Sequence, residues 1–514
     1  MQVETTQPNR EMPEVPPYAM RVVDALEAAG HEAWVVGGWV RDALMGRPGH
    51  DVDVTCSSPW EQTERVLRAA GIEVHQTGVT HGTVTAVVDG LPVETTTYRV
   101  EGAYSDRRHP DEVRFVTDVR QDLARRDFTV NAMAYHPRRG LLDPFGGERD
   151  LELGVIRAVG EPRRRFEEDA LRVLRAVRFA CRLGFSIEPA TQEALVACAG
   201  ELDAMARERV GAELDGILAS GRAAWALRHE FAVMAAAVPE LAPMAGFDQR
   251  SPYHAYDVAE HTARVCAGVE CACGGCPSQA LRWAALLHDV AKPACFSLDV
   301  SCRGHFFGHP EEGARVAGRV MGRLALPKSM TREAQALIRL HDLPVRPAAA
   351  SCRKMMSLLE AACPGRGRAL AFALVDLKRA DALAKAILQD AQEAADGTQQ
   401  TFGALEVAVL RQVIARTRKL YPARSHFAAR RGIEPVPVAV DVFPARDERS
   451  IAHEIPVRAN SVPPLAIRGL FALLARTALG RFACRQLAGR LRLRRSDRLL
   501  RRRRRGSGQR SLFL

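Results

Sequence analysis

Two aspartates separated by one residue carry the strongest chemical signal in this sequence. Asp51 and Asp53 alternate with valines in the run DVDVT, and the period of two in a β-strand places both carboxylates on one face. Carboxylates on one rigid edge suit Mg²⁺, a hard ion that takes oxygen ligands and usually retains a substrate phosphate. Two such ions can activate an attacking hydroxyl and stabilise a leaving pyrophosphate. Glu94, in the run VETTTYR, could supply a third carboxylate; the alternative interpretation is an exposed acidic strand edge.

A pair of glycines upstream favours the metal-site interpretation over the acidic edge. Gly37 and Gly38 follow the apolar run AWVV, and Arg41 and Asp42 enter the predicted helix after it. Glycines at a strand–helix junction let backbone N–H groups approach a phosphate closely, and the start of a helix adds a partial positive charge. The segment therefore predicts a site for a phosphorylated ligand and a metal ion.

The pattern of apolar residues predicts two kinds of region. A helix is expected at about 17–29, and short β-rich runs alternate with helical ones over 33–135, which is typical of a small α/β domain. The periodicity is helical from 166 to about 238. A break containing proline and glycine at 239–252 precedes a second helical block, at about 253–395. We expect an α/β head with a small mixed sheet, followed by all-α regions.

Six motifs resemble, in the same order, those of the class II nucleotidyltransferase family. They are GGWVRDALMG…DVDVT, VETTTYR, YSDRRHP, DLARRDFTVNAMAY, DPFGGERDL and RFEEDALRVLRAVRFA, and they cover roughly residues 18–240. The resemblance is to bacterial CCA-adding tRNA nucleotidyltransferases and their poly(A) polymerase relatives. It implies a nucleotidyltransferase head at 18–147 and a helical neck with nucleotide-base recognition at 148–246. One departure is Arg107, where the family usually has glycine in a mobile loop.

The resemblance implies roles for the head residues. Asp51 and Asp53 would bind catalytic Mg²⁺, and Glu94 is a further catalytic candidate. The triphosphate pocket would be shaped by Gly37, Gly38, Arg41 and Asp42. The run Arg125, Arg126 and Asp127 resembles the motif that holds the ribose and phosphates of the incoming nucleotide, which suits guanidinium forks and a carboxylate acceptor. The alternative is a helix-surface charge cluster, and Asn131 could either bind nucleotide or cap this segment.

The run EDALR, residues 168–172, matches the family motif that reads the base. Asp169 and Arg172 are three residues apart, which places both on one helix face. An acceptor and a forked donor can pair with the edge of cytosine or adenine, so that protein side chains choose the base; an intrahelical salt bridge is the alternative. Arg175 and Arg178 are further nucleotide-binding candidates. The run ERVGAEL resembles the next neck motif, and we expect it to pack helices rather than to do chemistry.

A second set of potential metal ligands lies in the predicted HD domain, residues 247–395. The order H…HD…H…H…D resembles the HD metal-dependent phosphohydrolase domain. The six residues are His261, His288, Asp289, His309, His341 and Asp381. Imidazole and carboxylate suit a divalent transition metal or Mg²⁺, and a bound water becomes the nucleophile. Relatives keep this domain as a helical platform or use it to trim 2′,3′-cyclic or phosphorylated RNA ends, and both alternatives stay open.

Four cysteines crowd the predicted loop between the first two HD helices. They are Cys266, Cys271, Cys273 and Cys276. Four thiols could bind Zn²⁺, but the spacing is not a standard two-knuckle pattern. Exposed thiols without a ligand are the favoured interpretation.

The formal net charge of +11 belongs to the C-terminal part of the chain. Residues 411–514 hold 25 Lys and Arg against 6 Asp and Glu, whereas the first 410 residues hold 47 against 55. The body is mildly acidic, so net charge gives no support there for binding nucleic acid. We expect residues 396–514 to form a helical to disordered Arg-rich tail. This tail is either a basic arm that contacts tRNA phosphates or the product of a reading-frame error.

The function expected from these features is template-independent addition of CCA to tRNA 3′ ends. The partners would be tRNA, CTP and ATP, with Mg²⁺ as cofactor and a second divalent metal in the HD domain. A poly(A) polymerase, or an A-only or CC-only enzyme, is the nearest alternative; an HD phosphohydrolase with an RNA-binding head is one of another class. Twelve sparse cysteines, no visible secretory signal and no apolar run of about 18 residues predict a cytoplasmic protein without membrane contact. The sequence leaves the oligomeric state open.

Overall fold

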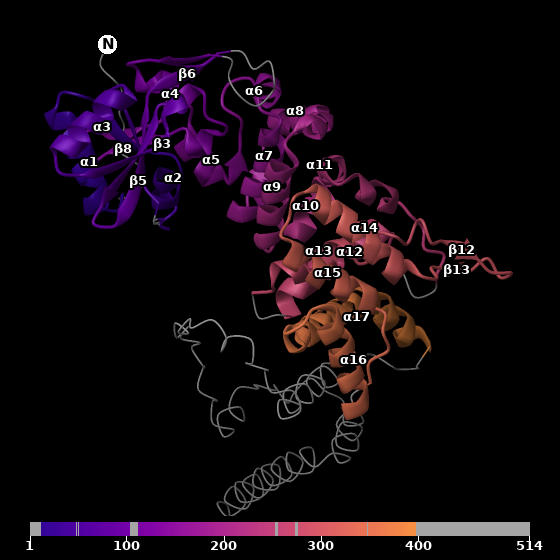
Figure 1. Ribbon diagram of the computed structural model, residues 1–514. Helices are drawn as coiled ribbons and strands as arrows, with labels where there is room; N and C mark the ends of the chain where they lie inside the picture. Colours follow the sequence, from indigo (N-terminus) through magenta and orange to yellow (C-terminus); the bar gives the residue numbers. More distant parts are fainter. Residues whose placement is uncertain are drawn as a thin grey trace, which may run out of the picture. The chain divides into compact units, whose positions relative to one another are not determined.

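The computed structural model describes residues 12–396, except for 48, 50, 103–111, 252–254, 273–275 and 347 (Figure 1). The predicted basic tail beyond 396 lies outside the described residues, as do Arg107 and Cys273. In the described part, no helix is both long enough and apolar enough to cross a membrane.

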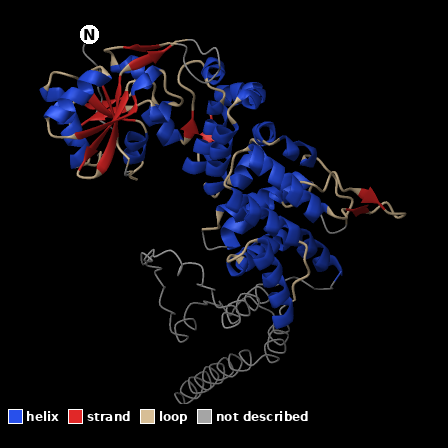
Figure 2. Ribbon diagram, viewed as in Figure 1, coloured by secondary structure: helices blue, strands red, loops and turns tan. Residues whose placement is uncertain are grey.

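A seven-stranded mixed sheet forms the centre of the head (Figure 2). Its strand order is β3-β4-β5-β2-β1-β8-β9; β2 and β5 run parallel, and every other neighbouring pair is antiparallel. The strands are β1 (Ala33–Val36), β2 (Asp53–Cys56), β3 (Glu73–Gly78), β4 (Thr83–Val88), β5 (Leu91–Thr97), β8 (Ala134–His136) and β9 (Gly140–Leu142). The small mixed sheet expected from the sequence is therefore confirmed.

Helices and a short strand pair complete the head. The helices are α1 (Pro17–Ala28), α2 (Gly38–Leu44), α3 (Trp60–Ala69), α4 (Val119–Ala124) and α5 (Gly147–Leu153). The strands β6 (Arg99–Glu101) and β7 (Val113–Phe115) pair with each other, apart from the main sheet. One face of α1 is apolar, and its buried residues join the core that the sheet strands form.

Helices make up most of the described part of the chain after the head (Figures 1 and 2). The neck holds α6 (Pro162–Glu168), α7 (Leu171–Leu183), α8 (Pro189–Cys198), α9 (Arg207–Ala219), α10 (Ala223–His229) and α11 (Phe231–Ala237). The following helices are α12 (Val258–Ala272), α13 (Gln279–Leu287), α14 (His309–Arg323), α15 (Lys328–Leu340), α16 (Ala349–Ala362) and α17 (Gly367–Asp396). Two further strand pairs are β10 (Val155–Ile156) with β11 (Ser186–Ile187), and β12 (Ser297–Leu298) with β13 (Gly304–His305).

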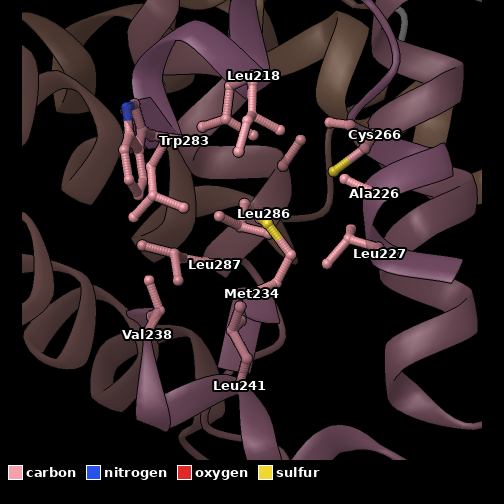
Figure 3. Close-up of a cluster of buried hydrophobic side chains, with 14 of the residues drawn as sticks. Leu218, Ala226, Leu227, Met234, Val238, Leu241, Cys266, Trp283, Leu286 and Leu287 are labelled. Atoms are coloured by element: carbon pink, nitrogen blue, oxygen red, sulfur yellow. The ribbon is translucent and has the colours of Figure 1, made fainter. Parts of the chain in front are cut away.

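A single apolar core runs from the neck helices into the following helical block. Figure 3 shows side chains of α9 to α13 meeting there, with Leu218 and Leu227 facing Leu286. The indole Nε1 of Trp283 donates a hydrogen bond to Asp215 Oδ1 at 2.8 Å, which ties α13 to α9. The two helical regions therefore pack as one body.

This shared core predicts the effect of one truncation. Leu286 is fully buried, so Leu286→Ala should lower the free energy of unfolding by about 2–5 kcal/mol, through lost transfer energy and a cavity. The matched control is Leu298→Ala, because Leu298 is 48% exposed and should change stability by less than about 0.5 kcal/mol. Chemical denaturation measures both changes. Equal effects of the two variants would contradict the continuous core.

The four cysteines that were expected to share one loop do not all lie in a loop. Cys266 lies inside α12 and is buried, and burial raises the pKa of its thiol to about 12. Cys271 also lies in α12, but it is exposed, as is Cys276. The prediction of one four-thiol loop was wrong because α12 extends to Ala272 and turns Cys266 into the core.

Candidate active site

Two of the predicted carboxylates lie side by side on neighbouring strands. Asp53 begins β2 and is in register with Glu94 of the parallel strand β5, so both side chains leave the same face of the sheet. Val52 and Val54 point the other way into the core. Burial, followed by the negative charges of Glu94 and Asp51, raises the pKa of Asp53. Three carboxylates thus repel one another here, which is an arrangement that a bound cation relieves.

The glycine at the end of β1 brings the backbone close to these groups. Gly37 has a φ of +72°, in the region that favours glycine, and a Cβ at this position would lie 2.9 Å from Arg126 Nη1. The same Cβ would lie 3.9 Å from Asp53 Oδ2. A side chain at residue 37 would therefore crowd Arg126, whereas Asp53 would remain at ordinary contact distance.

Arg41 connects the glycine turn to the segment that carries Asn131. Arg41 is buried in α2, and its Nη1 donates a hydrogen bond to Asn131 Oδ1 at 2.7 Å. Its Nε donates to Asp42 Oδ1 at 2.8 Å. Asn131 in turn donates from Nδ2 to Asp127 Oδ1 at 3.3 Å. Asn131 thus orders the segment and also lies at the pocket described below.

Asp122 holds both arginines of the Arg-Arg-Asp run, a role that the sequence analysis missed. Asp122 is fully buried in the first turn of α4; its Oδ1 accepts from Arg125 Nε at 2.9 Å, and Arg126 Nη2 lies 3.6 Å from Oδ2. Its Oδ1 also faces the backbone N–H of Arg99 at 3.3 Å. Although burial opposes ionisation, the two arginine charges lower the pKa of Asp122. Asp122 therefore positions two guanidinium groups from inside the head.

Asp127 is shared between the head and the neck. Its Oδ2 accepts hydrogen bonds from Arg175 Nε and Nη2 on α7, at 2.9 and 2.7 Å. Its Oδ1 accepts from the backbone N–H of Phe128 at 2.9 Å. Although burial acts in the opposite direction, the charge of Arg175 and these hydrogen bonds lower the pKa of Asp127. A carboxylate so held stays ionised and fixed in direction.

Removing Arg175 should show how much the ion pair between Asp127 and Arg175 stabilises the folded protein. Arg175→Met leaves an 8% exposed carboxylate without its guanidinium, and we expect the free energy of unfolding to fall by about 2 kcal/mol at pH 7. The lowered pKa means that this stability is present above the unfolded-state pKa of Asp127 and is lost as pH falls through the folded-state value. Denaturation of both proteins from pH 7 down to pH 3 should therefore show a shrinking difference.

The control for this prediction is Arg163→Met, which removes an arginine from an exposed pair with Glu167. This variant should leave stability unchanged at each pH. A difference between wild type and Arg175→Met that stays constant across this range would contradict the proposed linkage.

Asp169 and Arg172 come together at a break between helices, and not on one helix face. The chain leaves α6 at Asp169, which has φ −141° and ψ 102°, and Asp169 Oδ1 then accepts from the backbone N–H of Leu171 at 3.0 Å. Arg172, in α7, donates from Nη1 to Glu168 Oε2 at 2.8 Å. The predicted shared face was therefore wrong, since the helix is interrupted between the two residues. Both side chains nevertheless line one pocket.

This pocket, a cavity of about 620 Å³, gathers most of the predicted nucleotide-binding residues. Those that line it are Gly37, Gly38, Arg41, Asp53, Arg125, Arg126, Asp127, Asn131, Asp169, Arg172, Arg175 and Arg178. Asp42, Asp51 and Glu94 do not line it. Lining residues that the sequence analysis did not single out are His81, Arg99, Glu101, Phe179, Arg182 and Arg209. Two of these, Arg99 and Arg209, lie in the motifs VETTTYR and ERVGAEL, which could have drawn attention to them.

The charges of the lining favour a polyanion. The wall of the pocket holds nine arginines against four carboxylates. Guanidinium groups form paired hydrogen bonds with phosphate oxygens. Three of the guanidinium groups lie over the ring of Phe179, at 4.7–5.5 Å from its centroid. The arrangement can hold a triphosphate beside Asp53.

All six predicted HD ligands converge in the second helical block. They form two sets, and the potential ligand atoms of each set lie within 4.8 Å of one another. One set is His261, His288 and Asp381, and the other is Asp289, His309 and His341. Among the described residues the head carboxylates form no set this tight. The Oδ1 atom of Asp289 lies 3.4 Å from His309 Nε2 and 3.6 Å from His341 Nε2.

Three of these histidines are oriented in the same way. The Nδ1 atoms of His288, His309 and His341 lie 2.7–2.9 Å from backbone carbonyl oxygens three residues earlier. A carbonyl oxygen can only accept, so each Nδ1 carries a proton, and the three Nε2 atoms are turned toward Asp289. The buried Nε2 of His288 lies 3.1 Å from Asp289 Oδ2. Backbone support of this kind orients metal-ligating imidazoles, so the residues present fit a divalent metal ion.

Charge at this cluster is balanced by lysines that the sequence analysis did not name. Lys292 Nζ lies 2.7 Å from Asp289 Oδ2, and Lys385 Nζ donates to Asp381 Oδ2 at 2.8 Å. Although burial opposes ionisation, His288 and Lys292 hold the pKa of Asp289 well below its usual range. Both carboxylates are thus kept in the ionised form that a metal requires.

Comparison with known proteins identifies the three parts of the chain. Residues 33–157 match the poly A polymerase head domain, residues 184–244 match the family described as a probable RNA and SrmB binding site of polymerase A, and residues 253–386 match the HD domain. The chain thus resembles a polymerase-type head, a polymerase-type neck and an HD domain over three successive parts, in the order that the motif resemblance implies.

The individual relatives are CCA-adding enzymes. That of Lacticaseibacillus paracasei is 44% identical over 218 residues, which are 42% of this chain and 52% of the relative. That of Leuconostoc mesenteroides is 45% identical over 209 residues, 41% of this chain and 51% of the relative. The matches thus span about half the length of these relatives. The crystal structure of the Bacillus stearothermophilus CCA-adding enzyme in complex with CTP is 26% identical, with a TM-score of 0.51 over 78% of this chain and 93% of that one.

Proposed function

We propose that this protein adds CCA to the 3′ ends of tRNA, with CTP and ATP as the nucleotide donors. The observation that carries the proposal is the single arginine-rich pocket in which Asp53, the Arg125-Arg126-Asp127 run and Asp169 meet. The CCA-adding enzymes among its relatives, one of them crystallised with CTP, support the same assignment. Location in the cytoplasm belongs to this proposal, and free thiols at all ten described cysteines are in keeping with a reducing compartment.

Each group of site residues has a separate role in the reaction. Arg125 and Arg126 bind the triphosphate, and Asp127 accepts from a ribose hydroxyl. Asp169 and Arg172 pair with the base. The terminal ribose hydroxyl of the RNA then attacks the α-phosphorus and pyrophosphate leaves, so one phosphodiester bond forms as one phosphoanhydride bond breaks. Asp51 and Asp53 would hold Mg²⁺, which neutralises charge on the phosphates when it is bound.

The direct test uses tRNA that ends before CCA, incubated with CTP and ATP separately and together. The expected result is two cytidines with CTP alone and the complete CCA with both. Repeated addition of A without CTP would instead assign a poly(A) polymerase, while addition of only A or only CC would assign a partial enzyme. No addition of any nucleotide would overturn the proposal.

The converging HD ligands support a second activity, metal-dependent hydrolysis of 2′,3′-cyclic or terminal phosphates on RNA. Two adjacent ligand sets, with three imidazoles held by backbone carbonyl oxygens through Nδ1, are the specific observation in favour. Release of the phosphomonoester from a cyclic phosphate is measured with added Mn²⁺, Ni²⁺ or Mg²⁺. Turnover no greater than that of a His288→Ala/Asp289→Ala double variant would exclude this activity.

A further inference from the structure

Arg209 reaches the predicted base-reading carboxylate from a separate helix. Its Nη2 donates to Asp169 Oδ2 at 3.1 Å, across 40 residues of sequence. The side chains are 30% and 14% exposed, respectively, and both line the pocket. Arg209 lies in the ERVGAEL run of α9, whose expected role was helix packing alone.

The packing of α9 fixes the position of the backbone from which the Arg209 side chain extends. Val210 and Leu214 are fully buried in the neck core. A Cβ at Gly211 would lie 2.4 Å from the carbonyl oxygen of Leu324, so α9 lies directly against the end of α14. The helix cannot shift without disturbing that contact, and Arg209 is therefore presented to Asp169 from a rigid support.

The ion pair leaves Asp169 little freedom. Its Oδ1 accepts from the backbone N–H of Leu171, and its Oδ2 accepts from Arg209, so both oxygens and the carboxylate plane are held. A carboxylate has further lone pairs, so each oxygen can still accept from a ligand. The Asp169 carboxylate can therefore bind a hydrogen-bond donor of the base, whereas it repels an acceptor.

The four bases differ at this position. Cytosine and adenine carry an exocyclic amine, N4 or N6, which donates; uracil and guanine carry a carbonyl oxygen, O4 or O6, which accepts. A fixed, ionised carboxylate pairs with the first two and opposes the last two. A carboxylate that is free to rotate away loses that opposition.

We propose that Arg209 is a specificity-determining residue of nucleotide addition: by holding Asp169 in place, it rejects nucleotides that carry a carbonyl oxygen where CTP and ATP carry an amine. This inference rests on the proposed function. Arg209 acts through Asp169, so it is a positioning residue. Its own contact to the base is not required.

The experiment compares kcat/KM for CTP, ATP, UTP and GTP on tRNA ending before CCA or after CC. Arg209→Met removes the charge while it keeps most of the apolar stem, and Arg209→Lys keeps a charge. We expect discrimination of CTP against UTP, and of ATP against GTP, to fall about 10- to 100-fold in Arg209→Met, and less in Arg209→Lys. Arg207→Met is the matched control, because Arg207 lies in the same helix, pairs with exposed Asp203 and does not line the pocket.

A double-mutant cycle separates positioning from packing. In an Asp169→Ala background, Arg209→Met should change discrimination no further, because the group through which it acts is gone. Unchanged discrimination in both Arg209 variants, with equal losses for all four nucleotides, would overturn the inference. If Arg209→Met does not fold, the nucleotide discrimination of Arg209→Lys tests the inference. Failure of the proposed function is distinguishable, because wild type would then not complete CCA, whether it adds another sequence or no nucleotide.

Discussion

Replacing Asp53 by asparagine should reduce nucleotide addition by at least about 10³-fold. The side chain keeps its size, but one of the two predicted Mg²⁺ ligands loses its charge, and metal stabilisation of developing charge accounts for several kcal/mol of a phosphoryl-transfer barrier. Single-turnover incorporation of CTP into tRNA ending before CCA measures the loss. Binding of that tRNA should remain, because the basic lining of the pocket is untouched.

The same variant should be at least as stable as wild type in metal-free buffer at pH 7. Burial and the charge of Glu94 raise the pKa of Asp53 in the folded protein. Stability from the protonated carboxyl is therefore present below the unfolded-state pKa and is lost as pH rises through the folded-state value. At pH 7 the charged Asp53 opposes folding, and asparagine removes that charge.

The control for Asp53 is Asp89→Asn, which changes an exposed carboxylate of the head in a turn with φ +54°. It should alter neither incorporation nor Tm. Retained incorporation in Asp53→Asn would contradict the site assignment, and a clear fall in its Tm in the presence of a chelator would contradict the account of its stability. These two measurements separate loss of chemistry from loss of fold.

Replacing Asp289 by asparagine should abolish metal binding and any hydrolysis at the HD cluster, and leave nucleotide addition intact. Asp289 contributes to one ligand set directly and lies 3.1 Å from His288 of the other. Its loss also leaves buried Lys292 without its carboxylate, which should lower the free energy of unfolding by about 3 kcal/mol. Titration calorimetry with Mn²⁺ and thermal denaturation measure the two effects.

Stabilisation by a metal ion, without any substrate, gives a further test of the HD cluster. A metal ion at 100 times its Kd should stabilise wild type by about 2.7 kcal/mol and should not stabilise Asp289→Asn. Asp299→Asn is the control, because Asp299 pairs with His305 in the β12–β13 hairpin, outside both ligand sets. An undiminished rise in Tm with metal in Asp289→Asn would show that the ion binds elsewhere.

The strands of the head differ in how clearly their own sequence marks them. β4, TVTAVV, has a buried residue at every second position along its length. β3, EVHQTG, has one buried residue, Val74, and lies at the edge of the sheet, where little apolar surface is covered. A strand that contributes one side chain to the core has no period to detect.

The break at Asp169 was missed for a related reason. The residues on either side have helical periodicity, and nothing in EDALR forbids a continuous helix. At the break, Asp169 accepts from the backbone N–H of Leu171 and from Arg209, which belongs to a helix 40 residues away. The second of these contacts is tertiary, so local propensity does not show it.

The sequence by itself determined which chemical groups this protein has and in what order. The spacing of Asp51 and Asp53 indicated a metal site, because ligand types and strand periods are local properties. The resemblance of the Arg-Arg-Asp run and of the H…HD…H…H…D series to known motifs implied the nucleotide site and the second metal site. Only the tertiary structure decided which distant groups face one another: Arg175 against Asp127, His261 against Asp381, and Arg209 against Asp169. Such pairs depend on how distant segments pack, and packing leaves no periodic trace in the chain.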